Sequence, residues 1–243
     1  MMKDAAVSVR SEFHELGGWP PGTFLSRLAP EMVEVVLGLG SCTSFRRGEA
    51  LIHEGAQDTQ VLLLQSGTAK VTSHLGRDLA LLGIRVAGEV VGEMAASNGT
   101  ARTATVTACS DIEATIISGA DWNRLLDRHP VVLRAQQWTV SRRLQKANRW
   151  RAVASASEAK TKVALCLAEL ASDHGRPGWK GVVIDVALSQ AELGSLVGLR
   201  ERTVQKAIAD LRDDGAVGET GLARFTIFEE PLRRVLERDS GLR

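Results

Sequence analysis

The segment 92–108 contains residues whose types and spacing could bind a small anionic molecule. It reads Gly-Glu-Met-Ala-Ala-Ser-Asn-Gly-Thr-Ala-Arg-Thr-Ala-Thr-Val-Thr-Ala and places Glu93 nine residues before Arg102. A carboxylate can accept hydrogen bonds from a sugar hydroxyl, whereas the Arg102 guanidinium and the Thr103 hydroxyl can bind a phosphate. Gly92 lets the backbone approach a ligand closely. The alternative is a purely structural turn in which Glu93 and Arg102 pair with each other.

The residues around this segment predict an antiparallel β-roll that would position it. From 44 to 117, short apolar runs such as 61–64 and 69–72 alternate with glycine-bearing turns. The β-branched residues at 103–107 predict a strand directly after Arg102. In front of the roll, 24–39 predicts one or two short helices.

Pro130 is expected to begin a long helix, because proline is favoured in the first turn of a helix. No Gly or Pro interrupts it over residues 131–154. A narrow stripe recurs along it at steps of four and three, namely Leu133, Gln137, Val140, Leu144 and Ala147. Such a stripe favours a homodimer seam. The alternative is a helix that lies on its own β-domain, with Trp138 and Trp150 packed there. Residues 129–157 hold six Lys and Arg and no acid, which suggests a nearby anion.

The C-terminal part predicts a winged helix-turn-helix. An amphipathic helix at 158–171 is followed by a predicted loop at 173–178 and a strand at 182–186. Ser189 and Glu192 form a capping-box pattern at the start of the next helix. Gly198 is expected to end that helix.

A second helix at 201–213 and a hairpin within 215–228 complete this motif. Its N-terminal half would present a mixture of donors and acceptors suited to base edges and phosphates. The alternative is an ordinary solvated helix. The expected DNA contacts are Ser189, Gln190, Arg200, Glu201, Arg202, Thr203, Gln205 and Lys206.

Bulk properties narrow the class of protein. The 243 residues have a formal net charge of +1, and residues 158–243 are not basic overall, which counts against DNA binding unless their basic side chains share one face. The scattered Cys42, Cys109 and Cys166 predict reduced thiols in a cytoplasmic protein, with no metal or iron–sulfur site. No apolar stretch approaches a membrane span, and no nucleophile–base arrangement or P-loop indicates an enzyme.

Together, these features resemble the cyclic-AMP receptor protein and fumarate–nitrate regulator (Crp/Fnr) family of bacterial transcription factors over roughly residues 24–230. The resemblance implies an α+β fold with an antiparallel cyclic-nucleotide-binding β-roll, a long dimerisation helix and a C-terminal winged helix-turn-helix. It implies domains at 1–23 (N-terminal extension), 24–128 (β-roll), 129–157 (long helix and hinge), 158–230 (DNA-binding domain) and 231–243 (tail).

The same resemblance implies a cyclic nucleotide, cAMP or cGMP, as effector. The cysteine cluster of the family's oxygen-sensing branch is missing here and no histidine is a clear haem ligand, so neither metal nor haem is expected. The resemblance assigns ligand binding to Gly92, Glu93, Met94, Ala95, Arg102, Thr103 and Asn148. Where the family's enteric member has two hydroxyl side chains, this chain has Ala147 and Asn148, so the base is left open. Thr103 after the arginine is found in relatives that prefer cGMP.

The function expected from the sequence is therefore a homodimeric DNA-binding regulator, which would also contact RNA polymerase. Two alternatives stay open. One is a regulator of the same fold that binds no nucleotide, for which the small Ala95 and Ala96 beside the turn argue. The other is a nucleotide-responsive module whose helix-turn-helix binds protein. The operator sequence, the target genes and the sign of regulation are not encoded in any recognisable pattern.

Overall fold

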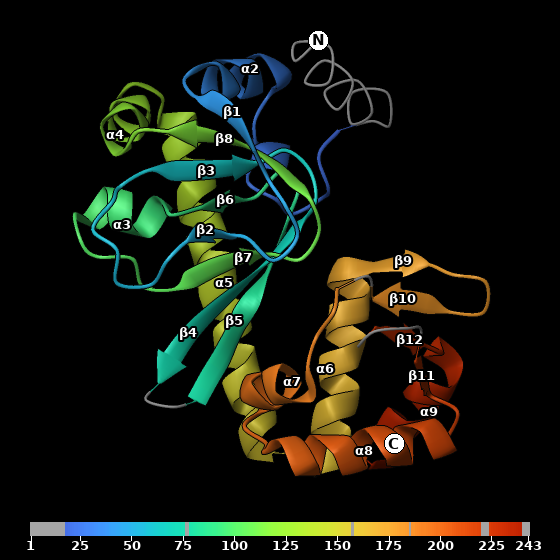
Figure 1. The fold of residues 1–243 in the computed structure, drawn as a ribbon. Coiled ribbons are helices and arrows are strands. Elements are labelled where there is room, and N and C mark those ends of the chain that lie inside the picture. The colour runs from blue at the N-terminus through green and yellow to red at the C-terminus, as the bar shows by residue number, and fades with distance from the viewer. Residues whose placement is uncertain (1–17, 76–77, 157, 185, 220–223, 240–243) are drawn as a thin grey trace. The chain divides into compact units, whose positions relative to one another are not determined.

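The structure, a computed structural model, describes residues 18–75, 78–156, 158–184, 186–219 and 224–239 (Figure 1). Contacts divide the chain into two units. The first contains the residues up to 73 together with 82–144, and the second contains 74–81 and 145–243. The division falls inside the long helix, so the segment 129–157 that the sequence set apart is shared between the two units. The predicted N-terminal extension lies, up to residue 17, outside the described residues.

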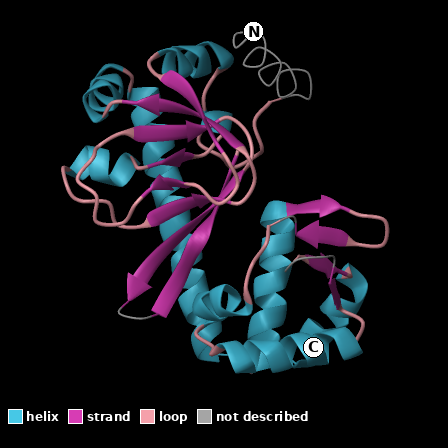
Figure 2. Ribbon diagram, in the orientation of Figure 1, coloured by secondary structure: helices cyan, strands magenta, loops and turns pink. Residues whose placement is uncertain are grey.

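The first unit is built on two antiparallel sheets of four strands each (Figure 2). One has the order β1-β8-β3-β6, from Ser41–Phe45, Ile112–Ile117, Val61–Leu64 and Val90–Val91. The other has the order β2-β7-β4-β5, from Ala50–Ile52, Thr105–Ala108, Thr68–Leu75 and Asp78–Val86. The predicted β-roll is confirmed, but the strand after Arg102 begins at Thr105 rather than Thr103.

Two apolar clusters hold this unit together. One lies within the roll and includes Leu64, Val106 and Ile112. The other joins the roll to the helices, where the Phe24 and Trp122 rings lie 5.7 Å apart. The helical elements of the unit before the long helix are η1 (Leu25–Arg27), α2 (Pro30–Gly38), α3 (Glu93–Asn98) and α4 (Gly119–Arg128). These two clusters hold the strands and helices from which the segment 92–108 extends.

The long helix α5 runs from Pro130 to Ala156 and has two different faces. One face is buried on the first unit through Val132 and Ala135, and the Trp122 indole donates a 2.8 Å hydrogen bond to Gln136. The predicted seam is exposed at every position, Leu133, Gln137, Val140, Leu144 and Ala147. The helix therefore does lie on its own β-domain, as the alternative stated, and it still leaves the apolar stripe uncovered.

Only one of the two tryptophans packs as that alternative expected. The Trp138 ring is half-buried in the first unit, with the guanidinium carbons of Arg27 and Arg142 at 4.8 and 5.6 Å from its centroid. Trp150 is buried, but it belongs to the second unit.

The second unit has the predicted winged helix-turn-helix. Its sheet has the order β11-β12-β10-β9, from Val217–Glu219, Phe225–Ile227, Val182–Ile184 and Gly175–Pro177. Its helices after α5 are α6 (Ala159–His174), α7 (Gln190–Val197), α8 (Glu201–Asp213) and α9 (Glu229–Asp239).

One expectation for this unit was wrong. The predicted loop at 173–178 is the end of α6 followed by β9, which pairs with β10. Gly175 permits this pairing, since a Cβ there would lie 2.2 Å from both the Ala171 carbonyl oxygen and Val182 Cγ1. The predicted tail from 231 includes most of α9, whose Leu232 and Val235 are buried.

Local sequence explains the geometry of α7 and α8. The Ser189 hydroxyl accepts a 3.1 Å hydrogen bond from the Glu192 amide, and the Glu192 carboxylate accepts a 2.8 Å bond from the Ser189 amide. The capping box is thus confirmed. Gly194 allows the turn before α8 to come close, because a Cβ there would lie 2.4 Å from the Leu199 carbonyl oxygen, and it also leaves room for Val204 of α8, whose Cγ2 would lie 3.3 Å away. None of the helices in the described part of the chain is long and apolar enough to cross a membrane.

Replacing Ser189 with Ala removes the N-cap acceptor of α7, and we expect the free energy of unfolding of the second unit to fall by about 1 kcal/mol. Urea denaturation followed by circular dichroism measures this. Ser141→Ala, at an exposed position on α5, is the control and should leave stability almost unchanged. Equal stability of Ser189→Ala and the control would contradict the structural role of the cap.

Candidate functional site

A pocket of about 80 Å³ lies in the first unit at the start of α3. The structure brings six of the seven predicted ligand-binding residues to it, namely Gly92, Glu93, Met94, Ala95, Arg102 and Thr103. The rest of the lining consists of Ile52, Val71, Arg85, Val91, Ala104, Val106 and Arg143. Asn148 is exposed on α5 in the second unit and does not line this pocket. The pocket is smaller than the roughly 300 Å³ of a typical ligand site.

Gly92 forms the turn that leads from β6 into α3. Its φ of +83° lies in the left-handed region that favours glycine. A Cβ at this position would lie 2.5 Å from Arg102 Nη1 and 2.7 Å from the Gln60 carbonyl oxygen. The close approach that the sequence assigned to a ligand is, in this structure, an approach to the arginine of the site itself.

Arg102 is buried, and all three nitrogens of its guanidinium donate hydrogen bonds to the protein. Its Nε donates a 3.1 Å hydrogen bond to Asp58 Oδ1, and Nη2 donates to the same oxygen. Nη2 also donates to the Gln60 carbonyl at 2.5 Å, and Nη1 to the Gly92 carbonyl at 2.8 Å. The hydrogen bond from Arg102 holds the pKa of Asp58 below its ordinary value. An acid of the chain therefore occupies the guanidinium edge that would bind a phosphate.

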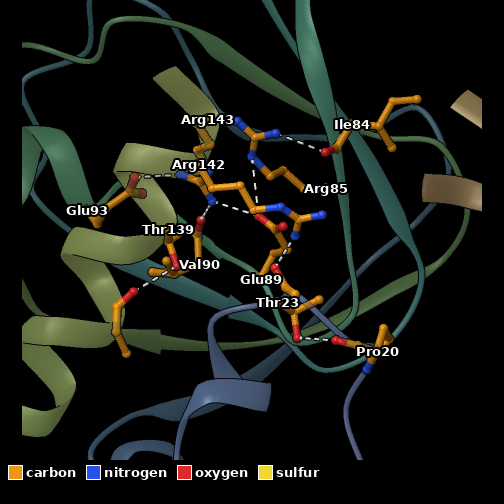
Figure 3. Close-up of polar contacts among 12 residues, drawn as sticks. Pro20, Thr23, Ile84, Arg85, Glu89, Val90, Glu93, Thr139, Arg142 and Arg143 are labelled. Carbon is orange, nitrogen blue, oxygen red and sulfur yellow. Dashed lines mark hydrogen bonds and ion pairs between the residues drawn. The ribbon is translucent and has the colours of Figure 1, made fainter. Parts of the chain in front are cut away.

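Glu93, the first residue of α3, is also buried and is paired with the long helix (Figure 3). Its Oε1 accepts a 2.6 Å hydrogen bond from Arg143 Nη1. Arg143 Nη2 donates to Glu89 Oε2 at 2.7 Å and to the Val90 carbonyl at 2.6 Å. Burial acts to lower the pKa of Arg143, but Glu93 and Glu89 outweigh it and the pKa is raised. The alternative in which Glu93 pairs with Arg102 is wrong, because each has a different partner.

Sequence reasoning missed four charged residues of this site, namely Asp58, Arg85, Glu89 and Arg143. The sequence counted Arg143 only among the six cations of 129–157. Asp58 lies in the segment between β2 and β3, 44 residues before Arg102, and no local pattern points to it. Arg85 did carry a signal, since it is a lone cation in the apolar strand Asp-Leu-Ala-Leu-Leu-Gly-Ile-Arg-Val. Glu89 follows β5 at a turn, and because acids are common in turns, no sequence pattern assigned it to the site. The pocket is therefore more highly charged than the segment 92–108 alone indicated.

The helix α8 separates its residues cleanly into two faces. Val204, Ala207, Ile208 and Leu211 are buried. The predicted DNA contacts on this element are all exposed, namely Arg200 at the N-cap and Glu201, Arg202, Thr203, Gln205 and Lys206 within the helix. Ser189 is exposed but its hydroxyl serves the cap, and Gln190 is half-buried. Arg202 and Lys206, which are four residues apart, thus lie on the same exposed side of α8, and Arg200 is exposed at its N-cap, although the C-terminal residues are not basic overall.

Comparison with known proteins matches both parts of the chain. Residues 42–129 match the family described as cyclic nucleotide-binding domain. Residues 161–231 match the family described as Crp-like helix-turn-helix domain. Together the two matches cover more than half of the chain.

Individual relatives agree with these matches. The chain is 29% identical over 194 residues to a cyclic AMP receptor protein of Thermus thermophilus, which covers 78% of this chain and 85% of the relative. It is 25% identical over 192 residues, with the same coverage, to a CRP-like cAMP-activated global transcriptional regulator of Mycobacterium tuberculosis.

Solved structures show the same fold. The c-di-GMP responsive global regulator CLP of Xanthomonas campestris has a TM-score of 0.71 at 18% identity and covers 82% of this chain and 99% of its own. A CRP-family transcriptional regulator of Thermus thermophilus has a TM-score of 0.66 at 23% identity, with 82% and 96% covered. A roll that matches the cyclic nucleotide-binding domain, a long helix and a Crp-like helix-turn-helix in this order place the chain in the Crp/Fnr family of transcription regulators, which are not enzymes.

Proposed function

We propose that this regulator senses a cyclic nucleotide in the pocket at the start of α3. The observation that carries the proposal is that a buried acid, Glu93, and a buried guanidinium, Arg102, line one pocket beside a glycine turn. Within the described residues, Glu93 Oε2 accepts no hydrogen bond, so it is available to a ribose hydroxyl. Arg102 and the exposed Thr103 would bind the cyclic phosphate.

Arg143 gives this pocket a physical connection to the long helix. Its guanidinium joins α5 to Glu93 on α3 and to Glu89 and the Val90 carbonyl. A ribose hydroxyl on Glu93 Oε2 would share the carboxylate that Arg143 holds through Oε1 and would alter the strength of that ion pair. Ligand binding would therefore favour one position of α5 over another, as a ligand-driven change requires. Asn148 on the same helix would cap the base and take part in this change.

A second candidate is a regulator of the same fold that needs no nucleotide. The small pocket and the pairing of Arg102 with Asp58 favour it, because the guanidinium that would bind the phosphate has a counterion without a ligand. Calorimetric titration of the whole protein with cAMP and with cGMP decides between the two candidates. Micromolar binding of either nucleotide supports the sensor, and the absence of heat at several temperatures supports the second candidate.

Replacing Arg102 with Leu removes the phosphate donors, and we expect the affinity for the bound nucleotide to fall about 100-fold. Asp58→Asn is the matched variant. It keeps Arg102 but removes the competing charge, so nucleotide should bind more tightly than to the wild type. Calorimetry measures both affinities, and thermal unfolding verifies that both variants are folded. Unchanged affinity in folded Arg102→Leu would refute phosphate binding at this residue.

The second unit would bind operator DNA through the exposed face of α8. Arg202→Ala and Lys206→Ala should each weaken binding about 10-fold or more, because each removes a base or phosphate contact. Fluorescence anisotropy measures the affinity for duplexes that the wild-type protein selects from a random-sequence library. Arg233→Ala, on the exposed side of α9, is the control. Full binding by both α8 variants would assign the DNA contact elsewhere.

The exposed stripe of α5 would form a homodimer. Leu144 is 59% exposed and lies with Leu133 and Val140 along this stripe. Leu144→Glu should convert a dimer into a monomer, because it places a carboxylate in an apolar seam. Sedimentation velocity measures the mass. Ser141→Glu adds the same charge beside the stripe and should remain dimeric, and loss of the dimer in both variants or in neither would contradict the seam.

A further inference from the structure

Arg85 is the one arginine of the pocket that has most of its hydrogen-bonding capacity unused among the described residues. It lies on β5, and its side chain is 13% exposed. Nη1 donates a 2.9 Å hydrogen bond to the Ile84 carbonyl. Nε lies 3.6 Å from Glu89 Oε2, too far for a hydrogen bond, and it is buried with no hydrogen-bond partner in the same set of residues. The other N–H groups of this guanidinium donate no hydrogen bond within the part of the chain that the structure describes.

The groups around Arg85 leave its buried N–H donors short of hydrogen-bond acceptors. Burial, and then the neighbouring Arg143, lower the pKa of Arg85 to about 10. Arg143 Nε is likewise buried with no partner in the described residues. Glu89 is shared between the two arginines, since its Oε2 accepts the 2.7 Å hydrogen bond from Arg143. Buried donors without acceptors are costly, and they occur where a ligand, ion or water completes the site.

Arg85 lines the same pocket as Glu93 and Arg102, which already account for a ribose hydroxyl and a phosphate. The remaining part of a cyclic nucleotide is its base. The planar guanidinium matches two adjacent acceptors, and guanine presents O6 and N7 in that way. Adenine presents N7 beside an amino group, which is itself a donor and would face the donors of Arg85.

We propose that Arg85 recognises the O6/N7 edge of the base and that the pocket therefore prefers cyclic GMP to cyclic AMP. This rests on the proposed function, namely that a cyclic nucleotide binds at Glu93 and Arg102. The ligand supplies the acceptors that Arg85 lacks, and the side chain moves within the pocket to make room for the base. Arg85 thus determines specificity, whereas Arg102 and Glu93 hold the part that all cyclic nucleotides share.

Cyclic GMP, cyclic IMP and cyclic AMP, each titrated calorimetrically into the whole protein, test this assignment. Cyclic IMP has O6 and N7 but lacks the 2-amino group, so it isolates the edge in question. We expect cyclic GMP and cyclic IMP to bind about 10-fold or more tightly than cyclic AMP. Arg85→Leu should remove this preference and leave cyclic AMP within a few-fold of its wild-type affinity. Arg85→Lys keeps the charge without the planar donors and should lose most of the preference.

Arg46→Leu, at an exposed position outside the pocket, is the control and should bind all three ligands as the wild type does. Equal binding of the three ligands, tighter binding of cyclic AMP, or cyclic IMP behaving like cyclic AMP would each overturn the assignment. So would Arg85→Leu binding all three more tightly, since Arg85 would then only fill the space of the base. If no nucleotide binds to either the wild type or Arg85→Leu, the proposed function itself fails, and the two failures are thereby distinguished.

Discussion

The ion-pair network around Arg143 is the interaction on which the geometry of the pocket depends. One guanidinium from α5 joins Glu93 at the start of α3, Glu89 after β5 and the backbone carbonyl of Val90. Because Glu93 is 2% exposed, its charge is stable in the core only with a cation beside it. One contact thus both shapes the pocket and helps to hold the first part of α5 on the roll.

Much of the fold could be predicted from local pattern. Helix α8 begins and ends where its periodicity indicated, and Ser189, Glu192 and Gly198 marked α7 through capping chemistry that depends only on near neighbours. The strand β9 was missed, because its pairing depends on close packing of Gly175 against Val182, which no short segment encodes. The helix α9 was missed because Glu229–Asp239 follows the motif that was sought rather than belonging to it.

The candidate site was predictable in part in its positions but not in its pairings. The pattern around Glu93 and Arg102 predicted six of the thirteen residues that line the pocket. Their partners come from distant segments, Asp58 from before β3 and Arg143 from α5, and only the fold brings them together. A sequence motif specifies which groups could contact a ligand, whereas long-range packing decides what those groups contact without one.

The Asp58 carboxylate is already paired with Arg102, so an anion that enters the pocket must replace this internal counterion, as in an ion exchanger. Asp58 is half-exposed at this contact, so it can swing into water when another anion takes its place. The free energy that a phosphate gains on entering is therefore the difference between its own ion pair with Arg102 and the ion pair that Asp58 gives up. This limits how tightly charge alone can hold a ligand. Because Asp58 stays on Arg102 until another anion replaces it, the buried guanidinium is not left without a counterion. A regulator of this fold could consequently lose a cyclic-nucleotide effector through few substitutions, because the roll is folded without the ligand and the DNA-binding domain remains.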